Sequence, residues 1–310
     1  MSSRAAAGGL LNAADLRRLS ALLIGGAATL VVPRSADVAI TRSWFRLYRA
    51  LAGKTIDRLA ARLERHLPSP WSGEPYRALA EQHVERRIED MWGRLRGLRR
   101  ERYAPHIEVD GIEHVRAALA RGRGVVVWCM RVGSATVIKR GFREQGLPLT
   151  HLSRVEHGSP TTTKLGIAVV APLFRRVEDA ALAERVQIPL GESLAYLHTL
   201  AERLAANACV SIFGEHPGRQ AVEVEVLGLR RRLALGAPSI AWRAQAGLVT
   251  AYALRESPFH HRVVIEEELP IDRGMPRRDF AELAVRQFAS RLEACIVRHP
   301  AEWHGWFFLS

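Results

Sequence analysis

The chain has 310 residues, 48% of them hydrophobic, which suffices for one large α/β domain, with or without a helical prelude, and an ample core. Its formal net charge of +13 is carried mostly by arginine and indicates an anionic partner, such as a phospholipid surface, a nucleic acid or a phosphorylated carrier. The three cysteines lie far apart in apolar stretches, so the sequence predicts buried reduced thiols, and neither a disulfide framework nor a Cys/His metal site.

The first predicted element is an apolar helix at residues 20–33, flanked by Arg17, Arg18 and Arg34. Fourteen helical residues reach about 21 Å, whereas the hydrocarbon core of a bilayer is about 30 Å thick. The segment is therefore a poor transmembrane span, and we expect it to dip into a bilayer or to lie flat on it. The basic flank also fits a signal peptide, although the cleavage context is weak.

A second helix is predicted at residues 42–66, where aromatic and aliphatic residues recur at helical spacing with basic residues between them. Residues 1–66 hold eleven Lys and Arg against four Asp and Glu. This composition is typical of an interfacial anchor on anionic lipid, although a helix packed on its own domain has the same pattern. A Pro-Ser-Pro break at residues 68–70 then divides a membrane-associating helical region, 1–70, from an α/β domain, 71–310.

The third helical stretch, residues 76–103, ends in a run of arginines. It carries no motif and no stacking aromatics for reading nucleic acid, so we expect a solvated or lipid-facing surface and no nucleic-acid partner. A short strand at 107–110 and a helix at 112–121 lead to the centre of the chain.

The central feature is a buried strand that runs into a loop and a helix. Residues 125–130 are apolar and rich in β-branched side chains, and Gly133 and Ser134 open a helical pattern that ends at Gln145. In open α/β sheets, ligands bind at the carboxyl ends of strands and at helix N-termini, so residues 131–136 are the expected site of chemistry. The glycines that precede this strand lie at the wrong end for a Rossmann turn, and the serine lacks the closing glycine of a hydrolase elbow.

The remaining pattern alternates strands and helices. We expect strands at 149–153 and 167–174, a surface helix at 178–187, a helix at 191–206, strands at 209–213 and 223–229, a helix at 235–245 and a strand at 247–252. Polar residues follow two of these strands, namely Arg154 and His157 after 149–153 and Glu215, His216 and Arg219 after 209–213.

This order of residues resembles the late acyltransferases of lipid A biosynthesis, the lauroyl/myristoyl transferases of bacterial inner membranes, and the related lysophospholipid acyltransferases. In that family a Gly-Val pair and a hydrophobic strand precede His-x-Gly-x-x-Glu, and Gly124, Val125 and Gly133 match this frame in register. Residues 235–252 and 299–306 also follow the family pattern. The resemblance thus covers about residues 75–308.

The family's catalytic histidine falls on Arg131 and its acidic residue on Thr136. A guanidinium stays protonated, with a pKa above about 12, so Arg131 cannot be the general base; it could bind a phosphate or a carboxylate, or donate to an oxyanion. The first candidate for a replacement base is His216 with Glu215, although neighbours on a regular strand point to opposite faces. The second is His157, although a loop histidine is more often a simple hydrogen-bonding residue.

The resemblance implies an α/β fold with a mixed, largely parallel sheet flanked by helices, like that of glycerolipid acyltransferases. It also implies transfer of a fatty acyl chain from acyl carrier protein or coenzyme A to a lipid hydroxyl, without a bound cofactor or metal. The expected location is the cytoplasmic face of the bacterial inner membrane, as a peripheral or monotopic protein on anionic lipids. The expected substrate-binding residues are Gly133, Ser134, Arg154, His157 and Arg219. The alternative is a catalytically inactive homologue that binds lipid or acyl carrier as a scaffold.

Overall fold

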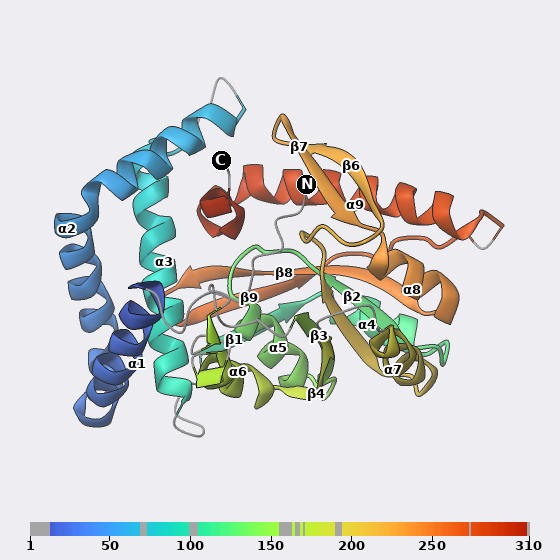
Figure 1. Ribbon diagram of the computed structural model, residues 1–310, viewed down its shortest axis with the longest axis horizontal. Helices are drawn as coiled ribbons and strands as arrows, with labels where there is room; N and C mark the ends of the chain where they lie inside the picture. The colour runs from blue at the N-terminus through green and yellow to red at the C-terminus, as the bar shows by residue number, and fades with distance from the viewer. Residues whose placement is uncertain are drawn as a thin grey trace.

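The computed structural model describes residues 13–68, 73–98, 105–154, 163–164, 168–169, 171–189, 194–272 and 274–308. Three long helices come first, and strands and helices then alternate toward the C-terminus (Figure 1). The helices are α1 (Ala13–Val31), α2 (Asp37–His66), α3 (Tyr76–Gly97), α4 (Ile112–Leu119), α5 (Ala135–Glu144), α6 (Ala171–Asp179), α7 (Ala195–Ala205), α8 (Gly236–Ala244) and α9 (Arg277–Arg298). The strands are β1 (His106–Asp110), β2 (Val125–Cys129), β3 (Leu149–Arg154), β4 (Leu182–Ile188), β5 (Cys209–Phe213), β6 (Ala221–Val226), β7 (Leu229–Ala234), β8 (Gly247–Ser257) and β9 (His260–Ile265).

The described strands form a seven-stranded sheet in the order β1-β9-β8-β2-β5-β3-β4 and a separate antiparallel hairpin, β6-β7. Strand β2 pairs in parallel with β5 and β8, and β3 pairs in parallel with β4 and β5. Only the pairing of β9 with β8 is antiparallel within the seven described strands. The predicted mixed, largely parallel sheet flanked by helices is therefore confirmed.

The central strand β2 is buried on both faces, as its continuous apolar run predicts. Val126 and Trp128 point into the core formed with α7, α8 and α9. Val125 and Val127 point into a second core formed with α4 and α5. Figure 1 accordingly shows α9 and α5 on opposite sides of the sheet, and the end of β2 opens toward the loop where chemistry is expected.

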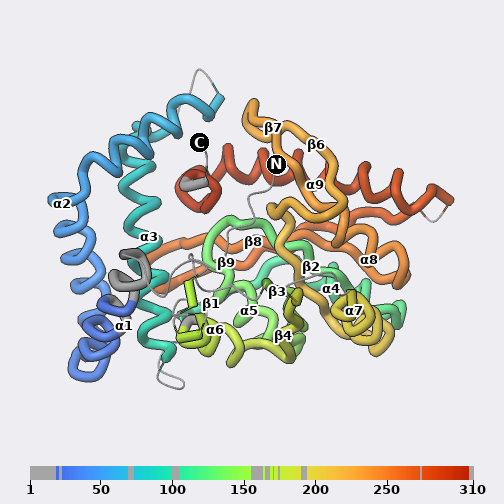
Figure 2. Tube along the Cα trace, in the orientation of Figure 1, coloured from blue at the N-terminus to red at the C-terminus, as the bar shows by residue number. Residues whose placement is uncertain are grey.

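Helices α1 to α3 stand together beside one end of the sheet (Figure 2). Helix α2 is kinked at Ala52, where the backbone leaves the helical region, and its second half buries Ile56, Leu59 and Leu63 in the core shared with α3 and α9. No helix in the described part of the chain is long and apolar enough to cross a membrane. The division into residues 1–70 and 71–310 stays a prediction.

Two predicted elements are wrong. Residues 171–174 belong to helix α6, where Pro172 is tolerated because the first helical turn needs no amide donor at that position. Residues 182–187, predicted as helix, lie in the edge strand β4, which pairs with β3 and buries Leu182 and Val186. The single strand predicted at 223–229 is the hairpin β6-β7, and β9 and α9 have no counterpart among the predicted elements.

Candidate active site

The loop after β2 is fixed by close backbone contacts. Gly133 adopts a φ of +66°, and an added Cβ would lie 2.0 Å from the Ala253 carbonyl oxygen, so only glycine fits there. Val132 forms an isolated β-bridge with Trp303, which brings the C-terminal segment onto the loop. The amide of Gly133 donates to the carbonyl of Glu302 at 2.9 Å. The loop that the sequence predicts as the site is thus held between β8 and the end of the chain.

Arg131 and Glu215 lie side by side at the ends of β2 and β5. The amide of Arg131 donates to Oε1 of Glu215 at 2.5 Å, and the Trp303 indole donates to Oε2 at 2.8 Å. Burial is the largest influence on the Glu215 carboxyl and raises its pKa, although these two hydrogen bonds oppose the shift. Burial likewise lowers the pKa of the Arg131 guanidinium, with Glu215 opposing this and Arg231 adding to it. Glu215 therefore accepts from the loop and the indole, and both its oxygens are engaged.

The other sequence-predicted residues differ in how deeply they are buried. His216 is half-buried and its carbonyl accepts from the Ala234 amide at 3.3 Å. Arg154 is exposed at the end of β3, and Arg219 is exposed just before β6. Thr136 is fully buried in α5, and its hydroxyl has no hydrogen-bond partner in the part of the chain that the structure describes. His157 lies outside the described residues.

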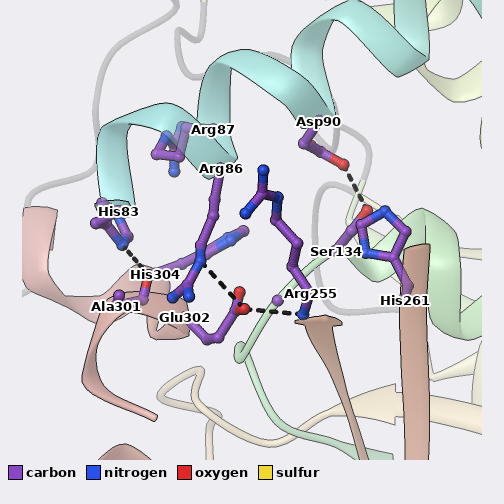
Figure 3. Close-up of a pocket in the computed structure, with 11 residues that line it drawn as sticks. His83, Arg86, Arg87, Asp90, Ser134, Arg255, His261, Ala301, Glu302 and His304 are labelled. Atoms are coloured by element: carbon purple, nitrogen blue, oxygen red, sulfur yellow. Dashed lines mark hydrogen bonds and ion pairs between the residues drawn. The ribbon is translucent and has the colours of Figure 1, made fainter. Parts of the chain in front are cut away.

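A cavity of about 20 Å³, lined mostly by polar residues, lies where α3, the loop after β2, β8, β9 and the C-terminal segment meet (Figure 3). Its walls combine titratable side chains with the two loop residues that the sequence singles out. The lining residues are His83, Arg86, Arg87, Asp90, Gly133, Ser134, Arg255, His261, Ala301, Glu302 and His304. Of these, only Gly133 and Ser134 are predicted from the sequence as site residues.

Ion pairs from three elements brace this cavity. The Arg255 guanidinium donates from Nε to Glu89 at 2.9 Å, and the Arg255 amide donates to Glu302 Oε1 at 2.9 Å. Arg86 pairs with the same Glu302 carboxylate at 3.4 Å. Burial is the main cause that raises the pKa of Glu302, while Arg86 and Arg255 lower it. These contacts tie α3, β8 and the C-terminal segment together.

A serine and a carboxylate meet at the cavity wall. The hydroxyl of Ser134 donates to Oδ1 of Asp90 at 2.5 Å, and Arg94 donates to the other oxygen of Asp90 at 2.9 Å. Burial would raise the pKa of Asp90, but Arg94 and the hydrogen bond from Ser134 lower it, so this carboxyl is ionised at neutral pH.

Three imidazoles face the same space. Burial is the largest cause that lowers their pKa values, to about 3 for His83 and His304 and to about 4 for His261. All three are therefore neutral at pH 7. The next influence is Arg87 for His83 and His304, which disfavours their charged forms, whereas for His261 it is Asp90, which favours the charged form.

Sequence reasoning missed Asp90, His261 and His304. The sequence of α3 held a weak signal, because His83, Arg87 and Asp90 are four and three residues apart, which places them on one face of a helix. For His261 no local signal exists, since β9 itself has no counterpart among the predicted elements. No group of three or more His, Cys, Asp or Glu within the described ranges could hold a metal ion.

Comparisons with known proteins add the family. A solved structure similar to this chain is the crystal structure of the 1-acyl-sn-glycerophosphate (LPA) acyltransferase PlsC from Thermotoga maritima, at 11% sequence identity and a TM-score of 0.33, covering 90% of this chain and 98% of that one. No curated protein sequence matches this chain. The family model for bacterial lipid A biosynthesis acyltransferases matches residues 15–308, which confirms the predicted resemblance. The chain belongs to the bacterial lipid A biosynthesis acyltransferase family.

Proposed function

We propose that this protein transfers a fatty acyl chain from a thioester, acyl carrier protein or coenzyme A, to the hydroxyl of a membrane lipid of the lipid A or lysophospholipid type. The observation that carries the proposal is the family match over residues 15–308. Such a reaction needs a base for the acceptor hydroxyl and positive charge or donors for the developing oxyanion. It needs no bound metal or cofactor.

Arg131 supplies the positive charge. Its half-buried side chain follows the carboxyl end of β2, the edge at which ligands bind in sheets of this kind. A second guanidinium, that of Arg231, lies 5.8 Å from the centre of the Trp303 ring and acts electrostatically on Arg131. The guanidiniums of Arg131 and Arg231 both act electrostatically on the buried carboxylate of Glu215. Their positive charge suits the thioester oxyanion or a phosphate of either substrate.

The helical region supplies the attachment to the bilayer. Large apolar side chains are exposed on α1 and α2, including Ile24, Val31 and Leu51 at 73%, 83% and 79% exposure. Exposed basic residues accompany them on α2, namely Arg42, Arg46, Arg49, Lys54 and Arg58. Apolar and basic side chains on one region are typical of peripheral binding to anionic lipid. The proposed location is the cytoplasmic face of the bacterial inner membrane.

A second candidate function is that of an inactive homologue that holds lipid or acyl carrier as a scaffold. The observation that favours it is that hydrogen bonds within the protein already occupy the groups of this loop. Both oxygens of Glu215 accept such bonds, and the His304 amide donates to the Arg131 carbonyl at 2.9 Å. Position 131 also carries a guanidinium in place of the family's imidazole.

The test is transfer of a labelled acyl chain by the full-length protein, from acyl carrier protein and from coenzyme A, to lipid A precursors and lysophospholipids in vesicles. We expect a lipid ester product, and Arg131→Met should lower its rate by about 10²- to 10³-fold, as loss of an oxyanion contact does elsewhere. Arg123→Met is the matched control, because that exposed arginine precedes β2 at the opposite edge of the sheet. Equal rates for both variants would contradict the role of Arg131.

A further inference from the structure

The cavity between α3 and the loop after β2 has the size of one small polar group. Its volume of about 20 Å³ admits a single water molecule or one hydroxyl. It adjoins Ser134, three residues beyond the position of the family's base, and it contains the imidazoles that the loop itself lacks. A small space lined mostly by polar side chains beside a reaction loop suits a bound hydroxyl.

His261 carries a buried nitrogen to which such a hydroxyl would donate a hydrogen bond. The residue is 8% exposed, and its Nε2 atom has no hydrogen-bond partner among the residues that the structure describes. A buried ring nitrogen without a partner is costly, and a ligand or water that donates to it removes that cost. Because the ring is neutral at pH 7, it has one nitrogen with a lone pair that can accept a proton.

Asp90 provides the anion that a protonated ring needs. Among the charged groups that act on His261, Asp90 of α3 is the strongest and favours the imidazolium, whereas Arg255 of β8 and His260 of the same strand oppose it. Ser134 holds one oxygen of this carboxylate at 2.5 Å, and Arg94 of the same helix holds the other at 2.9 Å. Ser134 stands at the N-cap position of α5 and makes no side-chain capping hydrogen bond there, so its hydroxyl serves Asp90 instead. Figure 3 shows Asp90, Ser134 and His261 grouped on one side of the cavity.

The other two imidazoles are poorer candidates. His83 and His304 are influenced most, after burial, by Arg87, whose positive charge disfavours a protonated ring. His83 Nδ1 also lies 2.9 Å from the Ala301 carbonyl oxygen, which commits that nitrogen to the backbone. Of the three imidazoles, His261 is therefore the one best placed to accept a proton.

We propose that His261 is the general base of this protein, with Asp90 stabilising its protonated form and Ser134 positioning Asp90. The inference rests on the proposed acyl transfer. The acceptor hydroxyl gives its proton to Nε2 of His261 while its oxygen bonds to the thioester carbonyl carbon. As the tetrahedral intermediate collapses, the carbon–sulfur bond breaks and the leaving thiolate takes the proton from the imidazolium. An ester and a thiol are the balanced products.

The test compares His261→Gln with His198→Gln in the single-turnover transfer of a labelled acyl chain. His198 lies on α7, where its side chain is 81% exposed in a surface pair with Glu202, so it is the control. We expect His261→Gln to lower the rate by about 10²- to 10⁴-fold and His198→Gln to leave it unchanged. Asp90→Asn should also lower the rate, while Asp90→Glu restores part of it.

The outcomes separate this inference from the proposed function. If the native protein transfers no acyl chain to any acceptor, the proposed function fails. If the native protein transfers and both histidine variants match it, the function stands and the cavity is only a structural water site. Should His261→Gln fail to fold, Ser134→Ala decides: a lower rate with an unchanged free energy of unfolding agrees with Ser134 positioning Asp90, and the native rate contradicts it.

Discussion

His83 shows how the burial of one side chain makes stability depend on pH. The imidazole is packed against the C-terminal segment, and burial together with Arg87 lowers its pKa from 6.5 to about 3. As the pH falls, His83 therefore binds a proton near pH 6.5 in the unfolded chain but only near pH 3 in the folded chain. The stabilising effect is fully present above pH 6.5 and is lost as the pH falls toward 3.

Replacing this histidine should flatten the acid limb of the stability curve. In urea unfolding between pH 7.5 and pH 5, the native protein should lose up to about 1.4 kcal/mol per pH unit more than His83→Gln does below pH 6.5. His198→Gln is the control, because the His198 side chain is 81% exposed in a surface pair with Glu202. Identical slopes for the native protein and His83→Gln would show that the buried ring does not exclude the proton.

For single residues, the sequence predicts which positions lie at the site better than it predicts the hydrogen-bond partners of their side chains. It singles out Arg131 and Ser134 because the strand, the glycine and the family frame are local in the chain. It also predicts Glu215 beside the same crevice, but not that the carboxylate accepts from an amide and an indole. Asp90 and His261 reach the site from 44 residues before Ser134 and from a strand with no predicted counterpart, so no local pattern could connect them.

Helices α2 and α3 are joined by two ion pairs of the same chemistry in different surroundings. Asp37 of α2 pairs with Arg96 of α3, and their side chains are 12% and 5% exposed. Arg96 also donates to the Thr29 carbonyl at 2.9 Å, so this pair holds the end of α1 as well. Nearer the other end of α2, Asp57 pairs with Arg77, and both side chains are more than half exposed.

The two aspartates should therefore differ sharply in their effect on stability. Asp37→Asn leaves a buried guanidinium without its counter-charge and should lower the free energy of unfolding by about 3–5 kcal/mol. Asp57→Asn removes a solvent-screened pair and should cost less than about 1 kcal/mol. Chemical denaturation of the two variants measures the difference. Similar losses for both would mean that Arg96 finds other compensation, and that α1 is not fixed through this pair.

Helices and strands were predictable from the sequence where one local pattern dominates. The run of β2 and the helix that follows it are confirmed, because continuous burial and a glycine turn leave few alternatives. The two wrong elements, around α6 and β4, are short stretches whose apolar content fits either structure. Their type is decided by pairing with β3 and by the tolerance of a helix start for proline, and neither is visible in a local window.

For the whole molecule, the apolar and basic surface of α1 and α2 predicts binding to lipid. In flotation with vesicles, the protein should bind more as the fraction of anionic lipid rises and less as salt is added. Leu47→Glu combined with Leu51→Glu should weaken binding, because both side chains are more than half exposed on α2. Leu283→Glu is the matched control, since that leucine is exposed on α9. An equal loss in both proteins would contradict attachment through the helical region.

The central claim is that this scaffold performs acyl transfer with Arg131 and Thr136 in the family's two catalytic positions. The most direct measurement is thiol release together with lipid ester formation by the purified native protein, beside the double substitution Arg131→His/Thr136→Glu. We predict that the native protein forms ester and thiol in equal amounts. A native protein that forms neither, with a double substitution that forms both, would contradict the account and identify the protein as the inactive homologue.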